Sequence, residues 1–336
     1  MSITIANIEF EPYRATLPTA VHRHPFGPQG RQCWLVRLTT SCGLTGVGDI
    51  APWPGFSPSA ADIRDELLDC GHLFADRLVS LESLMSDFWT QFEDLPAVVR
   101  SGLELSMLDA LSQSQQKPIA ALLSPVHLKT VQTHRLVDNA GDAMDAVANG
   151  FRTIKVKLSG DWRHDIERIG AIRAACPSTT IRLDANGAWT YSVARERLIT
   201  LQDIGLDIVE QPVAAHDIDG LQKLIRDTHV RISADESTVL NPHRVLALDG
   251  LHEIVLKPAF LGGLAASYAL GQRALAHQMA VCVTHSLESD IGRMGALHLA
   301  AALSADHGFV HGLSLSGITT GPALHIPSDA GLRRAG

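Results

Sequence analysis

The segment Thr153-Ile154-Lys155-Val156-Lys157-Leu158 is a short β-rich run that carries two lysines at its end, and a helix-length amphipathic stretch follows it. The same order of β-rich run, polar turn and helix-length stretch repeats from about residue 130 onward. This alternation is typical of a parallel sheet whose strands are joined by helices. The expected strands are 131–137, 153–158, 180–184, 207–210, 231–235, 253–257 and 280–284, with an eighth at 309–313.

The spacing of these runs predicts a closed barrel. Successive strands begin roughly 22 to 27 residues apart, which is the length of one βα unit in a barrel of about 200 residues. A doubly wound open sheet is the alternative, but no Gly-rich dinucleotide fingerprint follows any of the runs. We therefore predict a TIM-like (β/α) barrel over residues 101–313. The expected helices are 161–175, 192–204, 218–227, 264–278 and 290–303.

Residues 1–100 have a different pattern and predict an α+β capping domain. Strand-like runs at 3–10 and 33–39 precede a Pro-rich loop and polar helix patterns up to residue 92. A helix-like stretch at 96–123 leads into the barrel. The last segment, 314–336, is too short to fold alone, so we expect it to pack back on the first domain and complete it.

Composition excludes several classes of function. The 336 residues carry a formal charge of −8, and no block of Lys and Arg offers a surface for nucleic acid or an anionic membrane. No apolar run approaches the roughly 20 residues that span a bilayer, and residues 1–10 alternate like a strand rather than a signal peptide. The five cysteines are scattered, without the close pairs of a zinc site or disulfide framework. We expect a cytoplasmic protein with reduced thiols.

Charged residues stand at nearly the same point in successive βα units. They are Lys155 and Lys157 in the second run, then Asp184, Glu210, Asp235 and Lys257 at the ends of the next four. Active sites of such barrels lie at the C-terminal ends of the strands, so these side chains should surround one mouth. Lys155 and Lys157 should share a face, because side chains two apart in a strand project together.

Three carboxylates at one mouth predict a bound cation. They cannot all remain ionised side by side unless a positive charge lies between them. Ligation by Asp184, Glu210 and Asp235 favours Mg²⁺, and Mn²⁺ is an acceptable substitute. Lysines that flank such a site suit general-base catalysis, because burial and a nearby cation lower the pKa of an ammonium group. The expected partner is a small-molecule carboxylate.

Several motifs carry a resemblance to a known family. Lys155-Val156-Lys157, Asp184-Ala185-Asn186-Gly187, Glu210-Gln211-Pro212, Ala234-Asp235-Glu236-Ser237 and Lys257-Pro258 resemble the enolase superfamily, in its muconate-lactonising subgroup. Gly46-Val47-Gly48-Asp49 resembles the capping domain of that subgroup, although relatives often carry Glu where this chain has Asp49. Ser286-Leu287-Glu288-Ser289 and the residues that follow are most similar to the o-succinylbenzoate synthase family.

The resemblance implies a mechanism and a reaction. Lys157 would remove the proton next to a metal-bound carboxylate, Lys257 would stabilise the enediolate, and Lys155 would assist. Beta-elimination of water would then form o-succinylbenzoate for menaquinone biosynthesis, which makes the expected enzyme a carbon–oxygen hydro-lyase. The alternative on the same site is a racemase of N-acylated amino acids or an epimerase of dipeptides, with one lysine acting on each face. A barrel retained only as a binding or scaffold protein is the non-enzymatic alternative.

Six further residues are candidates for substrate binding, and five of them have a structural alternative. Arg182 would anchor an anionic substrate or form an ion pair inside the barrel. Asn186 would orient a metal ligand or form a turn. Gly262 and Gly263 would bind a second carboxylate through backbone N–H groups or form a tight turn. The other two candidates are Ser286 and Glu288, and Glu288 alternatively supplies only a negative charge at a helix start.

The Pro/Gly-rich segment 19–30, with His22 and His24, is a candidate lid over the mouth. Trp53 and Phe56 of the capping loop either cover an apolar part of the substrate or pack between the domains. His285 lies beside the expected mouth, and we expect it to be packed or solvent-facing rather than functional.

Overall fold

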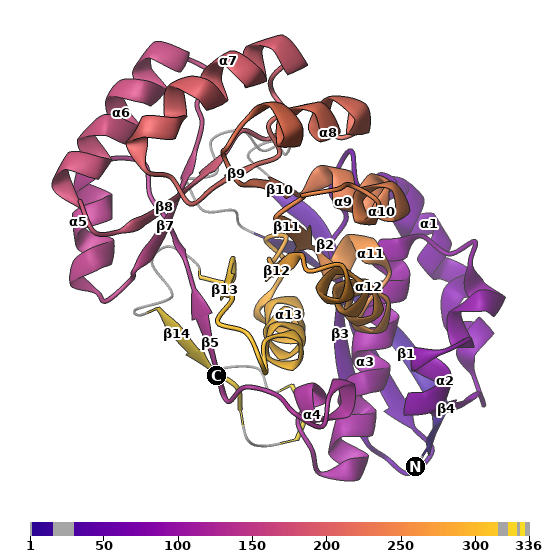
Figure 1. The fold of residues 1–336 in the computed structure, drawn as a ribbon. Coiled ribbons are helices and arrows are strands. Elements are labelled where there is room, and N and C mark those ends of the chain that lie inside the picture. The colour runs from indigo at the N-terminus through magenta and orange to yellow at the C-terminus, as the bar shows by residue number, and fades with distance from the viewer. Residues whose placement is uncertain (1, 16–29, 315–321, 328–329, 333–336) are drawn as a thin grey trace.

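The computed structural model describes residues 2–15, 30–314, 322–327 and 330–332. Figure 1 shows two parts side by side: an N-terminal capping part with β1–β4 and α1, and a part in which strands and helices alternate. The predicted fold class, a TIM-like barrel with an N-terminal α+β cap, is confirmed by this arrangement and by the similar folds reported below. The predicted lid segment 19–30, including His22 and His24, lies outside the described residues except for Gly30.

The cap is built on an antiparallel sheet with strand order β3-β2-β1-β4. Its strands are β1 (Ser2–Ala15), β2 (Arg31–Thr40), β3 (Thr45–Ile50) and β4 (Leu78–Ser80). Alternate residues of β2 are buried, as expected for a strand with one face on a core. The helices are α1 (Ala60–Cys70) and α2 (Leu81–Met85), with 3₁₀ turns at Gly71–Phe74 and Phe88–Phe92. A capping box at Ser59 and Asp62 begins α1.

The stretch expected as one helix at 96–123 forms two. Helix α3 (Ala97–Gln115) ends where Gln116 adopts a left-handed conformation with φ of 54°, and α4 (Ile119–Leu123) begins after Pro118. Proline lacks the N–H that a continuous helix would need, so the chain breaks there. Most side chains of α3 are buried, because it lies between the cap and the barrel.

The barrel strands match the expected runs, and each strand from β6 to β12 is followed by one or more helices. The strands are β5 (Thr130–Thr133), β6 (Arg135–Leu136), β7 (Thr153–Lys157), β8 (Thr180–Asp184), β9 (Ile208–Glu210), β10 (Ile232–Ala234), β11 (Glu253–Leu256), β12 (Ala280–Val283) and β13 (Val310–His311). The helices are α5 (Ala140–Ala148), α6 (Trp162–Ala175), α7 (Tyr191–Leu201) with its 3₁₀ extension Gln202–Ile204, α8 (Ile218–Asp227), α9 (Glu236–Leu240), α10 (Pro242–Leu246), α11 (Pro258–Leu261), α12 (Leu264–Ala276) and α13 (Asp290–Leu303). Side chains of Asn139, Asp161, Asp217 and Ser289 cap the starts of α5, α6, α8 and α13.

Hydrogen bonds close these strands into a ring. The parallel sheet runs from β12 through β7 to β6, and β5 continues into β6 across His134. Strand β13 pairs in parallel with β5, and a parallel bridge joins Thr284, after β12, to Gly312, after β13. With β5 and β6 taken as one broken strand, the described residues form a ring of eight: β5/β6, β7, β8, β9, β10, β11, β12 and β13.

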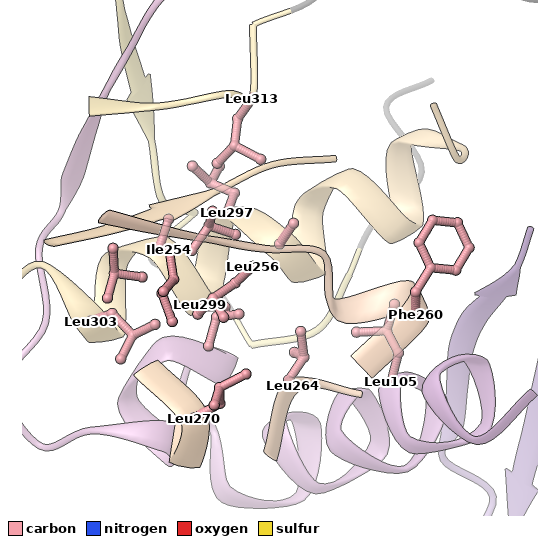
Figure 2. Close-up of a cluster of buried hydrophobic side chains, with 14 of the residues drawn as sticks. Leu105, Ile254, Leu256, Phe260, Leu264, Leu270, Leu297, Leu299, Leu303 and Leu313 are labelled. Carbon is pink, nitrogen blue, oxygen red and sulfur yellow. The ribbon is translucent and has the colours of Figure 1, made fainter. Parts of the chain in front are cut away.

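The core extends from the barrel to α3. Figure 2 shows Ile254 and Leu256 of β11 gathered with Leu297, Leu299 and Leu303 of α13. Leu105 of α3 lies in the same buried cluster, as do Phe260, Leu264, Leu270 and Leu313. Burial of each such side chain contributes roughly 1.5–3 kcal/mol relative to exposure. Helix α3 and the barrel are therefore held together by one continuous apolar core.

Strand β3 and helix α3 approach each other at backbone distance. A methyl group at Gly48 would overlap the carbonyl oxygen of Gly102, and one at Gly46 would overlap that of Ser106. Glycines at these points let the cap sheet lie directly on the helix that leads into the barrel. The Asp109 side chain of α3 accepts the Val47 N–H at 2.8 Å, which satisfies a donor on this edge strand.

The C-terminal segment contacts both parts of the molecule. Strand β14 (Ala323–His325) pairs antiparallel with β5 of the barrel. The Leu332 N–H donates to Asp109 Oδ1 at 2.6 Å, beside the contact of Asp109 with β3. The domain limits at residues 100 and 314 stay a prediction, and the first of them falls within α3. In the part of the chain that the structure describes, each helix is too short or too polar to cross a membrane.

We predict that Gly48→Ala will lower the free energy of unfolding by about 3 kcal/mol or more, because the new methyl group must push β3 away from α3. Gly170→Ala is the matched control. Gly170 lies in α6 with no neighbouring atom within 4 Å of an added Cβ, so alanine should raise helix stability by up to about 1 kcal/mol. Denaturant unfolding of both variants tests this. Equal stabilities would contradict the proposed contact.

Candidate active site

The charged residues predicted at strand ends lie around the C-terminal ends of β7 to β11, which we call the mouth. Lys155 and Lys157 belong to β7, Asp184 ends β8 and Glu210 ends β9. Asp235 directly follows β10 and Lys257 directly follows β11. In a ring of eight strands, β7 and β11 lie four places apart and are therefore opposite. The lysines of β7 face Lys257 across the mouth, and the carboxylates occupy the three strands between them.

Lys155 bridges two of the carboxylates. Its Nζ lies 2.6 Å from Glu210 Oε1 and 2.9 Å from Asp184 Oδ2, and all three side chains are buried. Burial would lower the pKa of Lys155, but the charges of Asp184 and Glu210 raise it above its ordinary value. Burial raises the pKa of Glu210 to about 7 despite Lys155. The pKa of Asp184, which burial would raise, is lowered to about 2 by Lys155 and Lys157.

Lys257 is paired with the third carboxylate. Its Nζ lies 2.6 Å from Asp235 Oδ2, and burial raises the pKa of Asp235 in spite of this ion pair. Burial would lower the pKa of Lys257, but Asp235 and Glu236 raise it. Lys157 is different, because its side chain is 48% exposed and its Nζ lies 3.9 Å from Asp184 Oδ2. Lys157 is therefore the lysine most open to a molecule entering the mouth.

We call the ends of β8 to β10, with Asp184, Glu210 and Asp235, the wall of the mouth. A divalent cation fits the chemistry of this wall, although the three carboxylates are not gathered into a ready cage. Among the described residues, no three His, Cys, Asp or Glu side chains are close enough together to hold a metal ion. Two buried carboxylate oxygens, Asp235 Oδ1 and Glu236 Oε2, have no hydrogen-bond partner within the described chain. Buried carboxylate oxygens without donors are suited to a hard cation. Lysine ammonium groups supply the positive charge in this structure.

Gln211 ties two of the strand ends together, and the sequence reasoning quoted it without giving it a role. Its Oε1 accepts the N–H groups of Asp235 at 2.9 Å and Ser237 at 3.0 Å. Its Nε2 donates to Ser237 Oγ and to the Val213 carbonyl, both at 2.8 Å. The side chain is fully buried and its backbone has φ of 41°, a strained conformation for a residue other than glycine. Gln211 therefore fixes the position of Asp235 relative to Glu210.

Asn186 acts through its backbone as well as its side chain. Its N–H donates to Asp184 Oδ1 at 3.0 Å, and its Nδ2 lies 3.3 Å from Glu236 Oε1. Its φ of 46° is the left-handed conformation of a turn. The turn foreseen for Asn186 is thus present, and its contact with Asp184 leaves the orienting of a metal ligand as a prediction.

The cap reaches the mouth through Arg31, which the sequence reasoning missed. This side chain is fully buried and donates to the carbonyls of Pro52 and Ser286, at 2.8 and 2.6 Å, and to that of Ala51. Arg31 also lies 5.0 Å from the centre of the Trp53 ring. A single cation therefore joins the cap loop to the loop that follows β12. Only a long-range contact reveals this role, so no local signal in the sequence could have found it.

Aromatic rings from both parts lie beside Lys257. Phe56 of the cap loop stacks on Phe260 of α11 with ring centres 5.0 Å apart, and Lys257 Nζ lies 5.0 Å above the Phe56 ring. Phe56 is thus placed at the mouth and also packs between the cap and the barrel. The packing alternative foreseen for this residue is present, and the covering of an apolar part of the substrate stays a prediction.

Three of the candidates for substrate binding are engaged by the chain itself. Arg182 is buried inside the barrel and pairs with Glu253, which is the ion-pair alternative. Gly263 packs against the carboxylate of Glu104 from α3, and Glu104 Oε1 accepts the Ala265 N–H at the start of α12 at 2.9 Å. Gly262 lies near the guanidinium group of Arg100. The geometry at α12 favours a tight turn capped by a carboxylate of the chain.

The loop after β12 holds the last two candidates. Glu288 accepts the Ser286 N–H and closes a turn in which Leu287 has φ of 59°. Burial raises the pKa of Glu288 to about 7. The Ser286 hydroxyl is buried without a partner among the described residues, so it remains available to a ligand. His285 Nδ1 accepts the Leu287 N–H at 3.1 Å, and burial lowers its pKa to about 4.

The fold and the ring of charged strand ends define a class of barrel enzyme with a capping domain. The sequence profile of the family described as enolase C-terminal domain-like matches residues 138–316, so the chain belongs to the enolase superfamily. The L-Ala-D/L-Glu epimerase of Escherichia coli K12 is 30% identical over 70% of this chain and 71% of its own length. The D-Ala-D/L-Ala epimerase of Cytophaga hutchinsonii is 28% identical over 86% of this chain and 79% of its own.

Solved structures show the same fold. The dipeptide epimerase of Enterococcus faecalis V583, described as complexed with Mg and the dipeptide L-Leu-L-Tyr, superposes with a TM-score of 0.84. The match covers 98% of this chain and 99% of that one, at 22% identity.

The prediction of a hydro-lyase that forms o-succinylbenzoate for menaquinone biosynthesis was wrong. The relatives named above are epimerases, which are isomerases and not lyases. The superfamily was predicted correctly because its motifs recur at the ends of successive barrel strands. The short run at 286–292 did not carry enough information to name the reaction.

We predict that Glu104→Gln will flatten the dependence of unfolding free energy on pH. Burial raises the pKa of Glu104 to about 7 from an ordinary 4.5, so the folded chain keeps a proton that the unfolded chain loses. Stability should therefore fall as pH rises from about 4.5 to about 7, by up to about 3 kcal/mol for this group. Unfolding measured across pH 4.5–8 tests this, with exposed Glu93→Gln as control. A Glu104→Gln profile with the wild-type slope would contradict the assignment.

Proposed function

We propose that this chain is a divalent-metal-dependent epimerase that inverts the α-carbon of an amino-acid residue with a free carboxylate and an acylated nitrogen. Dipeptides and N-acylated amino acids both have this form. The names of the relatives support inversion over elimination. The observation that carries the proposal is the placement of Lys157 and Lys257 on opposite strands of the ring, with three carboxylates between them.

Inversion needs a base on one face of the α-carbon and an acid on the other. The Lys157 amine would take the proton from one face, and the Lys257 ammonium would deliver a proton to the other. In the reverse direction the two residues exchange these tasks. Lys155 stays bound to Asp184 and Glu210, and its role is to offset part of their negative charge.

The residues that would hold the metal are Asp184, Glu210 and Asp235, with Gln211 and Asn186 positioning them. When bound, Mg²⁺ would polarise the substrate carboxylate and make the α-proton more acidic. Lys257 now pairs with Asp235 and must leave it to reach the substrate. The stacked rings of Phe56 and Phe260 exclude water next to Lys257 and leave an apolar surface there.

Proton exchange in D₂O separates the two lysines. We expect Lys157→Ala and Lys257→Ala each to lose epimerisation by at least about 10²-fold. Each variant should still exchange the α-proton of one substrate enantiomer. The enantiomer that Lys157→Ala still exchanges should be the opposite of the one that Lys257→Ala still exchanges. Exposed Lys117→Ala is the control and should behave as wild type. Epimerisation by either lysine variant, or loss of the same configuration in both, would rule out this arrangement.

Metal binding is tested by Gln211→Met. Loss of its hydrogen bonds should free Asp235 to move and weaken Mg²⁺ binding about 10–100-fold in titration calorimetry. Gln222→Met is the matched control. Gln222 lies in α8, and its side chain likewise hydrogen-bonds backbone atoms, in this case those of Asp249. Chelation should abolish exchange by the wild type, and added Mg²⁺ should restore it. Equal Mg²⁺ affinity of the two variants would show that Gln211 does not position the metal site.

A further inference from the structure

Three uncharged side chains near the mouth have buried polar atoms without a hydrogen-bond partner among the described residues. They are His134 Nδ1, Thr284 Oγ1 and Ser286 Oγ, and each residue is more than nine-tenths buried. A buried polar atom left unpaired costs about 1–3 kcal/mol, so such atoms are rare in native structures unless a ligand or water completes them.

These side chains lie where the ring of strands closes. His134 stands between β5 and β6, and Thr284 and Ser286 follow β12. A side chain at Gly312, after β13, would lie 2.6 Å from Thr284 Cγ2 and 3.3 Å from His134 Cε1. Thr284 and His134 therefore pack closely against the same backbone point, at which a larger residue would displace them. We call His134, Thr284 and Ser286 the seam group.

The surroundings of the seam group favour an uncharged ligand. Burial, then the charges of Arg182 and Lys155, lower the pKa of His134 well below its ordinary value, so its ring is neutral. The described residues 310–314, which include β13 and its pairing with β5, contain no Asp, Glu, Lys or Arg. The nearby carboxylate of Glu288 is already engaged by the Ser286 N–H. A substrate ammonium placed here would be buried without a counter-charge, which is costly.

We propose that the seam group is the site that binds the acyl end of the substrate, and that it selects an uncharged acyl group over one that carries an ammonium. The inference rests on the proposed function. The carboxylate of the substrate belongs at the β8–β10 wall, and its α-carbon belongs between β7 and β11. What remains of the substrate then extends to β12, β13 and β5/β6, where the hydroxyls and the neutral imidazole hydrogen-bond an amide carbonyl.

Two isosteric variants test the site. Thr284→Val and Ser286→Ala should each raise KM for N-acetyl amino acids about tenfold, the effect of one lost hydrogen bond, and leave kcat within about twofold. Thr228→Val is the control, since Thr228 is a buried threonine at the end of α8 whose hydroxyl bonds the Leu224 carbonyl. Calorimetric binding of the same ligands supplies a readout that does not require turnover. Unchanged KM and unchanged binding in both variants would overturn the proposal.

A matched pair of substrates tests the selectivity. N-acetyl and glycyl derivatives of the same L-amino acid differ by a single ammonium group. We expect kcat/KM for α-proton exchange to be at least about tenfold higher for the N-acetyl compound. Preference for the glycyl compound would overturn the selectivity for an uncharged group. Failure of the wild type to exchange any α-proton would instead refute the proposed function, and the binding measurements on the variants would still decide the seam group.

Discussion

The structure depends on the pairing of buried carboxylates with lysines at the mouth of the barrel. Asp184, Glu210 and Asp235 are brought together by adjacent strands, and none can remain ionised there without a positive neighbour. Lys155 and Lys257 supply that charge through contacts of 2.6 to 2.9 Å. Because the lysines and the carboxylates neutralise one another, a cation that binds the carboxylates would also free Lys257. Under the proposed function, cation binding and the availability of Lys257 would thus be linked in one network.

The ring of strands gives each part of the mouth a separate chemistry. Strands β8 to β10 carry carboxylates, β7 and β11 carry amines on opposite sides, and the seam between β12 and β5 carries uncharged polar groups. The cap contributes Arg31, which binds carbonyls of its own loop and of the loop after β12. Glycines at 46, 48 and 102 allow the cap sheet to contact α3 directly. The position of the cap is therefore set by backbone packing, and its loops are held by one buried guanidinium group.

The error about the reaction has a physical origin. Elimination and inversion both begin with removal of an α-proton beside a carboxylate, so they require the same carboxylates and the same first lysine. The reactions differ in what the rest of the substrate contacts. Under the proposed function those contacts would come from the cap and from the seam, where single residues rather than repeated motifs carry the information. The epimerase relatives corrected the reaction without changing the superfamily.

The sequence by itself determined the barrel. The period and spacing of its β-rich runs are local properties, and each βα unit repeats them. It also placed Lys157, Asp184, Glu210, Asp235 and Lys257 around one mouth, since each ends a run in the same register. Only the tertiary structure decided that Arg182 pairs with Glu253, that Gly263 faces Glu104, and that Gln211 and Arg31 join distant loops. These contacts connect residues that are from 24 to 255 positions apart. A local pattern cannot encode such pairings, because they depend on how the strands close into a ring and where the cap lies upon it.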